Sequence, residues 1–149
     1  MNEKPVVRKI VDRKGAAYYT IFWSHLKKSD KYEIVKSVPS DSGIFELYSM
    51  DAKGKLNLFF LGKSWYGGLR NELRFRTDPE LEKDKARREK LEKLEIYYRY
   101  SLASSNDDMA DIMFFFAETY FPGSRTYTPS GRYDTIYVKE ESEDKIVTI

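Results

Sequence analysis

The chain has 149 residues, enough for one domain with a full hydrophobic core. It contains no cysteine and one histidine, which excludes disulfide scaffolds, thiolate metal sites and histidine-rich metal sites. Hydrophobic residues make up 41% and charged residues 34%, with a formal net charge of +2, a composition typical of a globular protein. No secretory leader is visible and no apolar run reaches the ~18 residues of a membrane helix. We therefore expect a cytoplasmic protein without a membrane partner.

The first forty residues favour strands. Residues 6–11 are apolar and β-branched with basic interruptions, which suggests an edge strand or arm. Residues 17–23 are rich in strand-forming side chains, and residues 32–38 alternate in part, so each predicts a strand. A turn is expected at 27–30, and Pro, Ser, Asp and Gly break the chain at 39–43.

A hairpin is predicted next. Residues 44–50 and 56–61 have the pattern of strands, joined by a glycine-bearing turn at 51–55. Because apolar side chains occupy both faces of 56–61, we expect that strand to be central and covered on both sides.

Helical patterns follow the hairpin. Leu69 and Leu73 lie one turn apart in a short helix over 69–76. A capping-box spacing begins at Thr77, and leucines and a tyrosine at helical spacing predict one helix over about 79–102. The remaining predicted elements are a helix over about 107–120 that ends at Pro122–Gly123, a strand over 133–138 and a short strand over 146–149.

The order of these elements predicts an α+β fold. We expect a small, mainly antiparallel sheet, with the hairpin 44–61 at its centre, covered by helices and extended by N-terminal strands. No repeat or long linker divides the chain, so residues 1–149 are expected to form a single domain.

Charge is unevenly distributed along the sequence. Residues 1–36 and 53–76 each carry a net charge of +5, whereas residues 134–149 carry −3. The near-neutral net charge therefore conceals a basic N-terminal half of the sequence. Such a half is compatible with a surface that binds nucleic acid and also with an ordinary solvated surface.

The sequence contains few short motifs that are typical of catalytic or binding sites. Gly62-Lys63-Ser64 lacks the earlier glycine of a phosphate-binding loop, because Asn57 occupies that position. The lone His25 is expected at the surface rather than in a catalytic triad. Trp65 and Tyr66 follow a strand and precede two arginines, so they could line a groove or close a core.

The hairpin and the helix after it resemble the GIY-YIG nuclease superfamily. The resemblance rests on Gly43-Ile44-Phe45, on Phe60-Leu61-Gly62-Lys63-Ser64, and on Arg70, ten residues after Phe60. It implies a core over about 42–138, with residues 1–40 as an addition.

The resemblance also implies residue roles. Arg70 would be the family's essential arginine, with Lys63 beside it, and Glu118 would bind a divalent metal such as Mg²⁺. Asp108 and Asp111 are weaker matches for the metal ligand.

Both signature tyrosines of that family are phenylalanines here, Phe45 and Phe60. Phenylalanine keeps the shape but has no hydroxyl to orient or deprotonate a water molecule. Alternation places Tyr48 on the face opposite Phe45, so it does not replace the lost hydroxyl. We therefore expect a degenerate domain that has no cofactor and that binds its ligand without cutting it.

Three functions follow from these residues. The first is non-catalytic binding of DNA, RNA or a protein partner in a basic groove formed by Lys63, Trp65, Tyr66, Arg70 and Arg74. The second is an active Mg²⁺-dependent nuclease, with Glu118 on the metal and Arg70 stabilising charge. The third is a structural or protein-interaction module. The sequence leaves the oligomeric state open.

Overall fold

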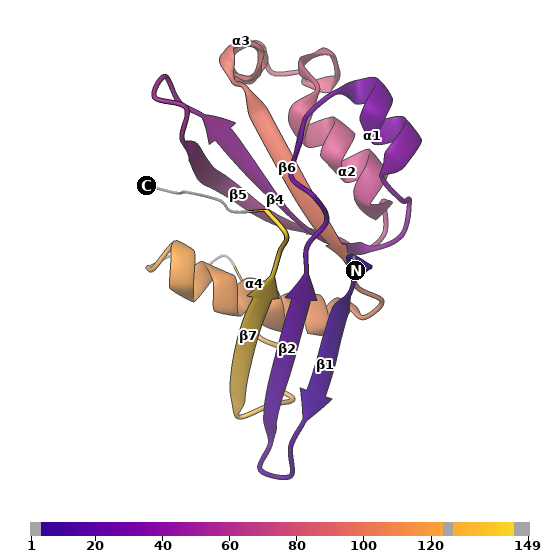
Figure 1. Ribbon diagram of the computed structural model, residues 1–149, viewed down its shortest axis with the longest axis vertical. Helices are drawn as coiled ribbons and strands as arrows, with labels where there is room; N and C mark the ends of the chain where they lie inside the picture. Colours follow the sequence, from indigo (N-terminus) through magenta and orange to yellow (C-terminus); the bar gives the residue numbers. More distant parts are fainter. Residues whose placement is uncertain (1–3, 124–126, 145–149) are drawn as a thin grey trace.

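The computed structural model describes residues 4–123 and 127–144, which form an α+β fold with two sheets (Figure 1). Within these residues, no helix has the length and apolar character needed to cross a membrane. The elements in chain order are β1 Val7–Val11, β2 Ala16–Phe22, β3 Lys27–Lys28, α1 Lys31–Ser37, β4 Gly43–Met50, β5 Leu56–Ser64, α2 Gly68–Thr77, a 3₁₀ turn Pro79–Leu81, α3 Lys85–Lys93, β6 Ile96–Leu102, α4 Asn106–Tyr120 and β7 Thr135–Glu141.

The larger sheet has four antiparallel strands in the order β3-β6-β4-β5. Strand β4 lies inside it, paired with β5 on one side and β6 on the other. Strands β4 and β5 form the predicted hairpin, and their pairing has a register shift between Leu47 and Tyr48. The expectation that 56–61 is central is wrong, because β5 is an edge strand of this sheet.

The smaller sheet has three strands in the order β1-β2-β7. Strands β1 and β2 form an antiparallel hairpin, whereas β2 and β7 run parallel. These strands confirm the extended segments predicted at 17–23 and 133–138.

Helices cover the four-stranded sheet from two sides. On one side, α1 and α2 pack against β4 and β6, and Ile34, Leu69 and Leu73 are buried there with Phe45 and Tyr98. On the other side, α4 joins the two sheets through a second core. Residues of α4, both sheets and their connections form this core: Ala17, Tyr19, Ile21, Trp23, Ile44, Leu61, Ala103, Met109, Ile112, Met113 and Phe116.

Residues 31–37 form a helix, so the strand predicted at 32–38 is wrong. Asp30 caps α1, because its side chain accepts hydrogen bonds from the backbone N–H groups of Tyr32 and Glu33. Ile34 and Val38, four positions apart, are buried against α2 and the sheet. The apolar residues fit this helical spacing as well as they fit partial alternation.

The predicted helix over 79–102 is also wrong. The segment is divided into the 3₁₀ turn, α3 and strand β6. Asp78 and Asp84 each provide an N-cap, so two separate short helices begin within the segment. Strand β6 forms because Ile96, Tyr98 and Arg99 gain partners beside β4 and are buried there. The strand predicted at 146–149 lies outside the described residues.

Candidate functional site

The two motif segments of the hairpin lie side by side. Gly43 pairs with Ser64, and Phe45 pairs with Gly62. Phe45 is fully buried, and a side chain at Gly62 would overlap the Phe45 ring and lie 2.7 Å from the Phe60 ring. Packing therefore explains this glycine and the two aromatic residues around it.

Arg70 has a backbone partner in this structure. Its Nε donates to the carbonyl oxygen of Val38 at 2.8 Å, and its backbone N–H donates to that of Pro39 at 3.1 Å. These bonds fasten the beginning of α2 to the end of α1. Arg70 therefore has a positioning role within the helical layer.

Lys63 lies across the sheet from α2. Lys63 pairs with Ile44, and directly paired residues of an antiparallel sheet point to the same face. That face is covered by α4, where Lys63 Nζ donates to Asn106 Oδ1 at 2.7 Å. The structure therefore does not gather Lys63, Arg70 and Arg74 on one face of the sheet.

The residues proposed for a divalent metal are also not gathered. Glu118 is exposed on α4, across the four-stranded sheet from Arg70. Asp108 and Asp111 accept hydrogen bonds from Arg132 at 2.8 and 3.0 Å. Across residues 4–123 and 127–144, no three acidic or histidine side chains come together as a metal site. The described residues thus do not fit a Mg²⁺ site.

Asp108 and Asp111 instead belong to a hydrogen-bonded network at the start of α4. Asp111 is fully buried and accepts from the Tyr19 hydroxyl, the Ser130 backbone and hydroxyl, and Arg132. Burial disfavours the Asp108 carboxylate, but hydrogen bonds from Arg132 and Lys9 outweigh it and lower its pKa. This network joins α4 to β1, to β2 and to the segment that precedes β7.

Trp65 and Tyr66 lie directly before α2 and contact each other edge to face, with ring centroids 6.5 Å apart. The Tyr66 side chain is 97% exposed, and Trp65 is partly exposed. Neither ring closes a core, so both are accessible to a ligand.

Helices α1 and α2 pack together and carry more cations than acids, and we call their outer side the α1–α2 surface. It carries five cations, Lys31, Lys36, Arg70, Arg74 and Arg76, against two acids, Glu33 and Glu72. Tyr32 and Phe75 are 75% and 58% exposed on the same two helices. The first basic segment of the sequence supplies α1 and the second supplies α2, so the structure brings parts of both together.

Arg74 differs from its neighbours on this surface. Its Nε is buried, and no hydrogen-bond partner for it exists among the described residues. By contrast, Arg76 binds Glu72 at 2.9 Å and lies 4.4 Å above the Phe60 ring. Arg74 therefore has donor capacity that its surroundings leave unsatisfied.

Sequence reasoning missed a buried ionic cluster. Glu46 and Arg99 face each other across β4 and β6, and Arg99 Nε donates to Glu46 Oε1 at 2.6 Å. Tyr48 also donates to Glu46, and Glu140 lies 3.5 Å from Arg99. Burial raises the pKa of Glu46 against the attraction of Arg99. Single charges inside apolar strands are the sequence signal for this cluster, and the helical spacing of 79–102 obscures that signal.

The comparison with known families gives a match along most of the chain. Residues 7–149 match a family model whose description is "Uncharacterised protein". The chain belongs to this family. No curated protein and no solved structure matches the chain. The family description names no activity.

Proposed function

We propose that this protein is a nucleic-acid-binding domain, a degenerate relative of the GIY-YIG nucleases that binds single strands without cutting them. The α1–α2 surface carries the proposal. Its cations come from both basic segments of the sequence and lie on two helices that pack together. A cationic layer of this kind attracts a phosphate backbone without regard to sequence.

Exposed aromatic rings support binding of single strands. Tyr66 lies just before α2, Tyr32 lies on α1, and Phe75 lies near the end of α2. Unpaired bases stack on such rings, and each stacked base contributes about 1–3 kcal/mol. Cations interleaved with accessible rings are typical of sequence-tolerant single-strand binding.

The family's catalytic roles have little support in the geometry. Phe45 is enclosed in the core, the Nε of Arg70 is bonded to Val38, and Glu118 lies on the other side of the sheet. A water molecule positioned between these residues would need groups that are not close together. This arrangement favours binding over phosphodiester hydrolysis.

The test is a fluorescence-anisotropy titration of labelled single-stranded RNA and DNA of mixed sequence. We expect weak, sequence-tolerant binding that falls steeply between about 50 and about 200 mM salt. Lys36→Gln on α1, which removes an exposed cation, should weaken binding to every sequence and reduce the salt slope by about one, because one phosphate contact is lost. Lys139→Gln on β7 is the matched control, since it removes an exposed cation away from α1 and α2.

The same samples test catalysis. We expect no cleavage in Mg²⁺ or Mn²⁺, beside a Glu118→Ala variant. Metal-dependent cleavage that disappears in the variant would make the protein an active nuclease. A titration without binding at low salt would favour a protein partner, for which the exposed Phe75 and Tyr32 are also suited.

A further inference from the structure

The smaller sheet has an accessible edge at β1, which is its outer strand. In Figure 1 the β1–β2 hairpin extends away from the four-stranded sheet, with β1 along its outer side. Arg8, Lys9, Ile10 and Val11 are all exposed. An edge strand of this kind offers unpaired backbone groups to another extended chain.

The hydrogen bonds of the hairpin determine which backbone groups of β1 point outwards. The N–H of Asp12 donates to the carbonyl oxygen of Ala16 at 3.0 Å, so these residues form a hydrogen-bonded pair. Such pairs alternate with non-hydrogen-bonded pairs along an antiparallel ladder, and the register continues unbroken to Val7. The N–H and C=O groups of Lys9 and Val11 therefore point away from β2.

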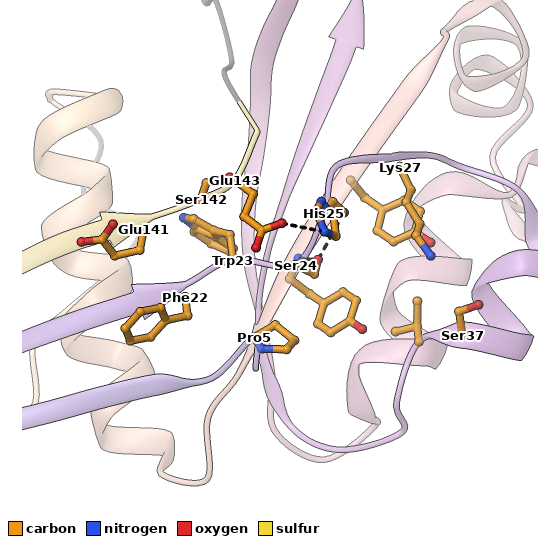
Figure 2. A pocket seen from close by; sticks show the side chains of 13 residues that line it. Pro5, Phe22, Trp23, Ser24, His25, Lys27, Ser37, Glu141, Ser142 and Glu143 are labelled. Carbon is orange, nitrogen blue, oxygen red and sulfur yellow. Dashed lines mark hydrogen bonds and ion pairs between the residues drawn. The ribbon is translucent and has the colours of Figure 1, made fainter. Parts of the chain in front are cut away.

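The chain itself closes the end of this edge that lies nearest the four-stranded sheet. Pro5 precedes β1 and lies beside the pocket between the two sheets (Figure 2). Its carbonyl oxygen accepts from the N–H of Leu102 at 2.6 Å, and Val6 forms a bridge with the same residue. Within the described residues, the open part of the edge is therefore short and is centred on Ile10.

Ile10 begins a row of exposed apolar side chains across the outer face of the smaller sheet. It pairs with Tyr18, and Tyr18 pairs with Tyr137. The two tyrosine rings are stacked with centroids 5.0 Å apart, whereas the Ile10 side chain is 72% exposed. Because β1 is the outer strand, an apolar residue placed beside Ile10 on a further strand would remove more of this surface from water.

The charges along β1 favour a second copy of the same strand as that neighbour. When two copies pair antiparallel with Ile10 opposite Ile10, Arg8 of each copy lies opposite Asp12 of the other. Lys9 then lies opposite Val11, and these are the residues whose backbone groups point outwards, so each pair can exchange both hydrogen bonds. A register centred on Lys9 would instead place two lysines directly opposite each other.

The lysine of the edge does not oppose this pairing. Lysines on edge strands commonly prevent association, but Nζ of Lys9 donates to Asp108 at 2.9 Å and to the Tyr133 hydroxyl at 3.0 Å. Its charge is thus compensated within its own copy. Arg8 lies 5.2 Å from the centroid of the Phe22 ring, on the face of the sheet that Ile10 shares.

We propose that the protein forms a homodimer in which β1 of two copies pairs antiparallel about Ile10 and joins the two smaller sheets into one. A two-fold axis uses the same patch on both copies, so the assembly closes and leaves no further β1 edge. Helices α1 and α2 cover the other sheet, so the dimer does not depend on the proposed binding of nucleic acid.

Sedimentation velocity without nucleic acid measures the association. The open edge is short, so we expect a weak dimer, mostly monomeric at about 1 µM and mostly dimeric at about 1 mM. Ile10→Lys places like charges opposite each other and should raise the dissociation constant about tenfold or more. Val35→Lys is the matched control, because it changes a β-branched residue that is 45% exposed on α1. Circular dichroism should show that both variants remain folded.

Single cysteines test the register, because the chain contains no cysteine of its own. Opposite residues of a non-hydrogen-bonded pair have Cα atoms about 4.5 Å apart, a distance that a disulfide spans. Ile10→Cys should therefore give a disulfide-linked dimer under mild oxidation by copper phenanthroline. In Val11→Cys the two thiols lie diagonally, with Cα atoms about 7–8 Å apart, so we expect little cross-linking.

Four results would overturn the proposal. These are a monomer at about 1 mM, an unchanged dissociation constant in Ile10→Lys, equal cross-linking of the two cysteine variants, and assemblies larger than a dimer. The last would indicate that β1 pairs with β7 of the next copy in an open chain. None of these measurements contains nucleic acid, so they remain decisive whether or not the strand titration shows binding.

Discussion

The carboxylate of Glu46 lies buried on the α4 face of the four-stranded sheet, where Arg99 and Tyr48 are its donors. Burial raises its pKa, and nearby Glu140 acts in the same direction. A carboxyl group whose pKa is raised by folding stabilises the protein below its ordinary pKa of about 4.3 and loses that contribution as the pH rises.

Glu46→Gln should therefore gain stability relative to the unmodified protein as the pH rises from about 4 to 7. Glutamine keeps the shape of the side chain and removes the charge that burial disfavours. Each tenfold difference between the folded and unfolded acid constants contributes about 1.4 kcal/mol. Urea unfolding at several pH values measures this trend, with the exposed Glu118→Gln as the control. A trend of opposite sign would mean that attraction to Arg99 exceeds the effect of burial.

Among the secondary-structure elements, the β4–β5 hairpin depends on a glycine that faces two rings. An added methyl group at Gly62 would approach Phe45 and Phe60 more closely than real side chains do. Phe45 is fully buried and has no space into which to move.

Gly62→Ala should lower the free energy of unfolding by about 1–3 kcal/mol, the usual cost of overpacking. Gly67→Ala is the matched control, because Gly67 has a φ of −82° and a methyl group added there would have no atom within 4 Å. Denaturant titration compares the two variants. Equal changes in the free energy of unfolding for the two variants would show that the Phe45 and Phe60 rings move aside at little cost.

The hairpin and α4 were predictable because one periodicity dominates each. The segments 31–37 and 96–102 were not, because their apolar residues fit both helix and strand periods. For residues 31–37, the N-cap at Asp30 favours the helix, and this signal is local in the sequence. Pairing with β4 decides the second, and that partner lies about fifty residues earlier in the chain. The candidate site was missed where it depends on such pairing, as for Glu46 and Arg99.

At the scale of the whole molecule, α4 connects the two sheets through a shared core and through Asp111. Asp111→Ala should lower the free energy of unfolding by about 1–3 kcal/mol, because the Ser130 backbone N–H and hydroxyl lose a buried acceptor. Asp107→Ala changes an exposed acid of the same helix and should cost less than about 1 kcal/mol.

Both sheets should unfold together when the protein and the Asp111→Ala variant are titrated with denaturant. Tryptophan fluorescence and circular dichroism should give one coincident transition for the unmodified protein and for Asp111→Ala. Separate transitions would indicate that the shared core does not couple the sheets.

The parallel pairing of β2 with β7 has a consequence for synthesis on the ribosome. Ala16 pairs with Thr135, so the third strand of the smaller sheet emerges long after the β1–β2 hairpin (Figure 1). Until then the growing chain holds β2 with one edge unpaired, and such edges recruit other extended chains. Slow translation between β2 and β7 should therefore increase aggregation of the nascent protein and its dependence on chaperones.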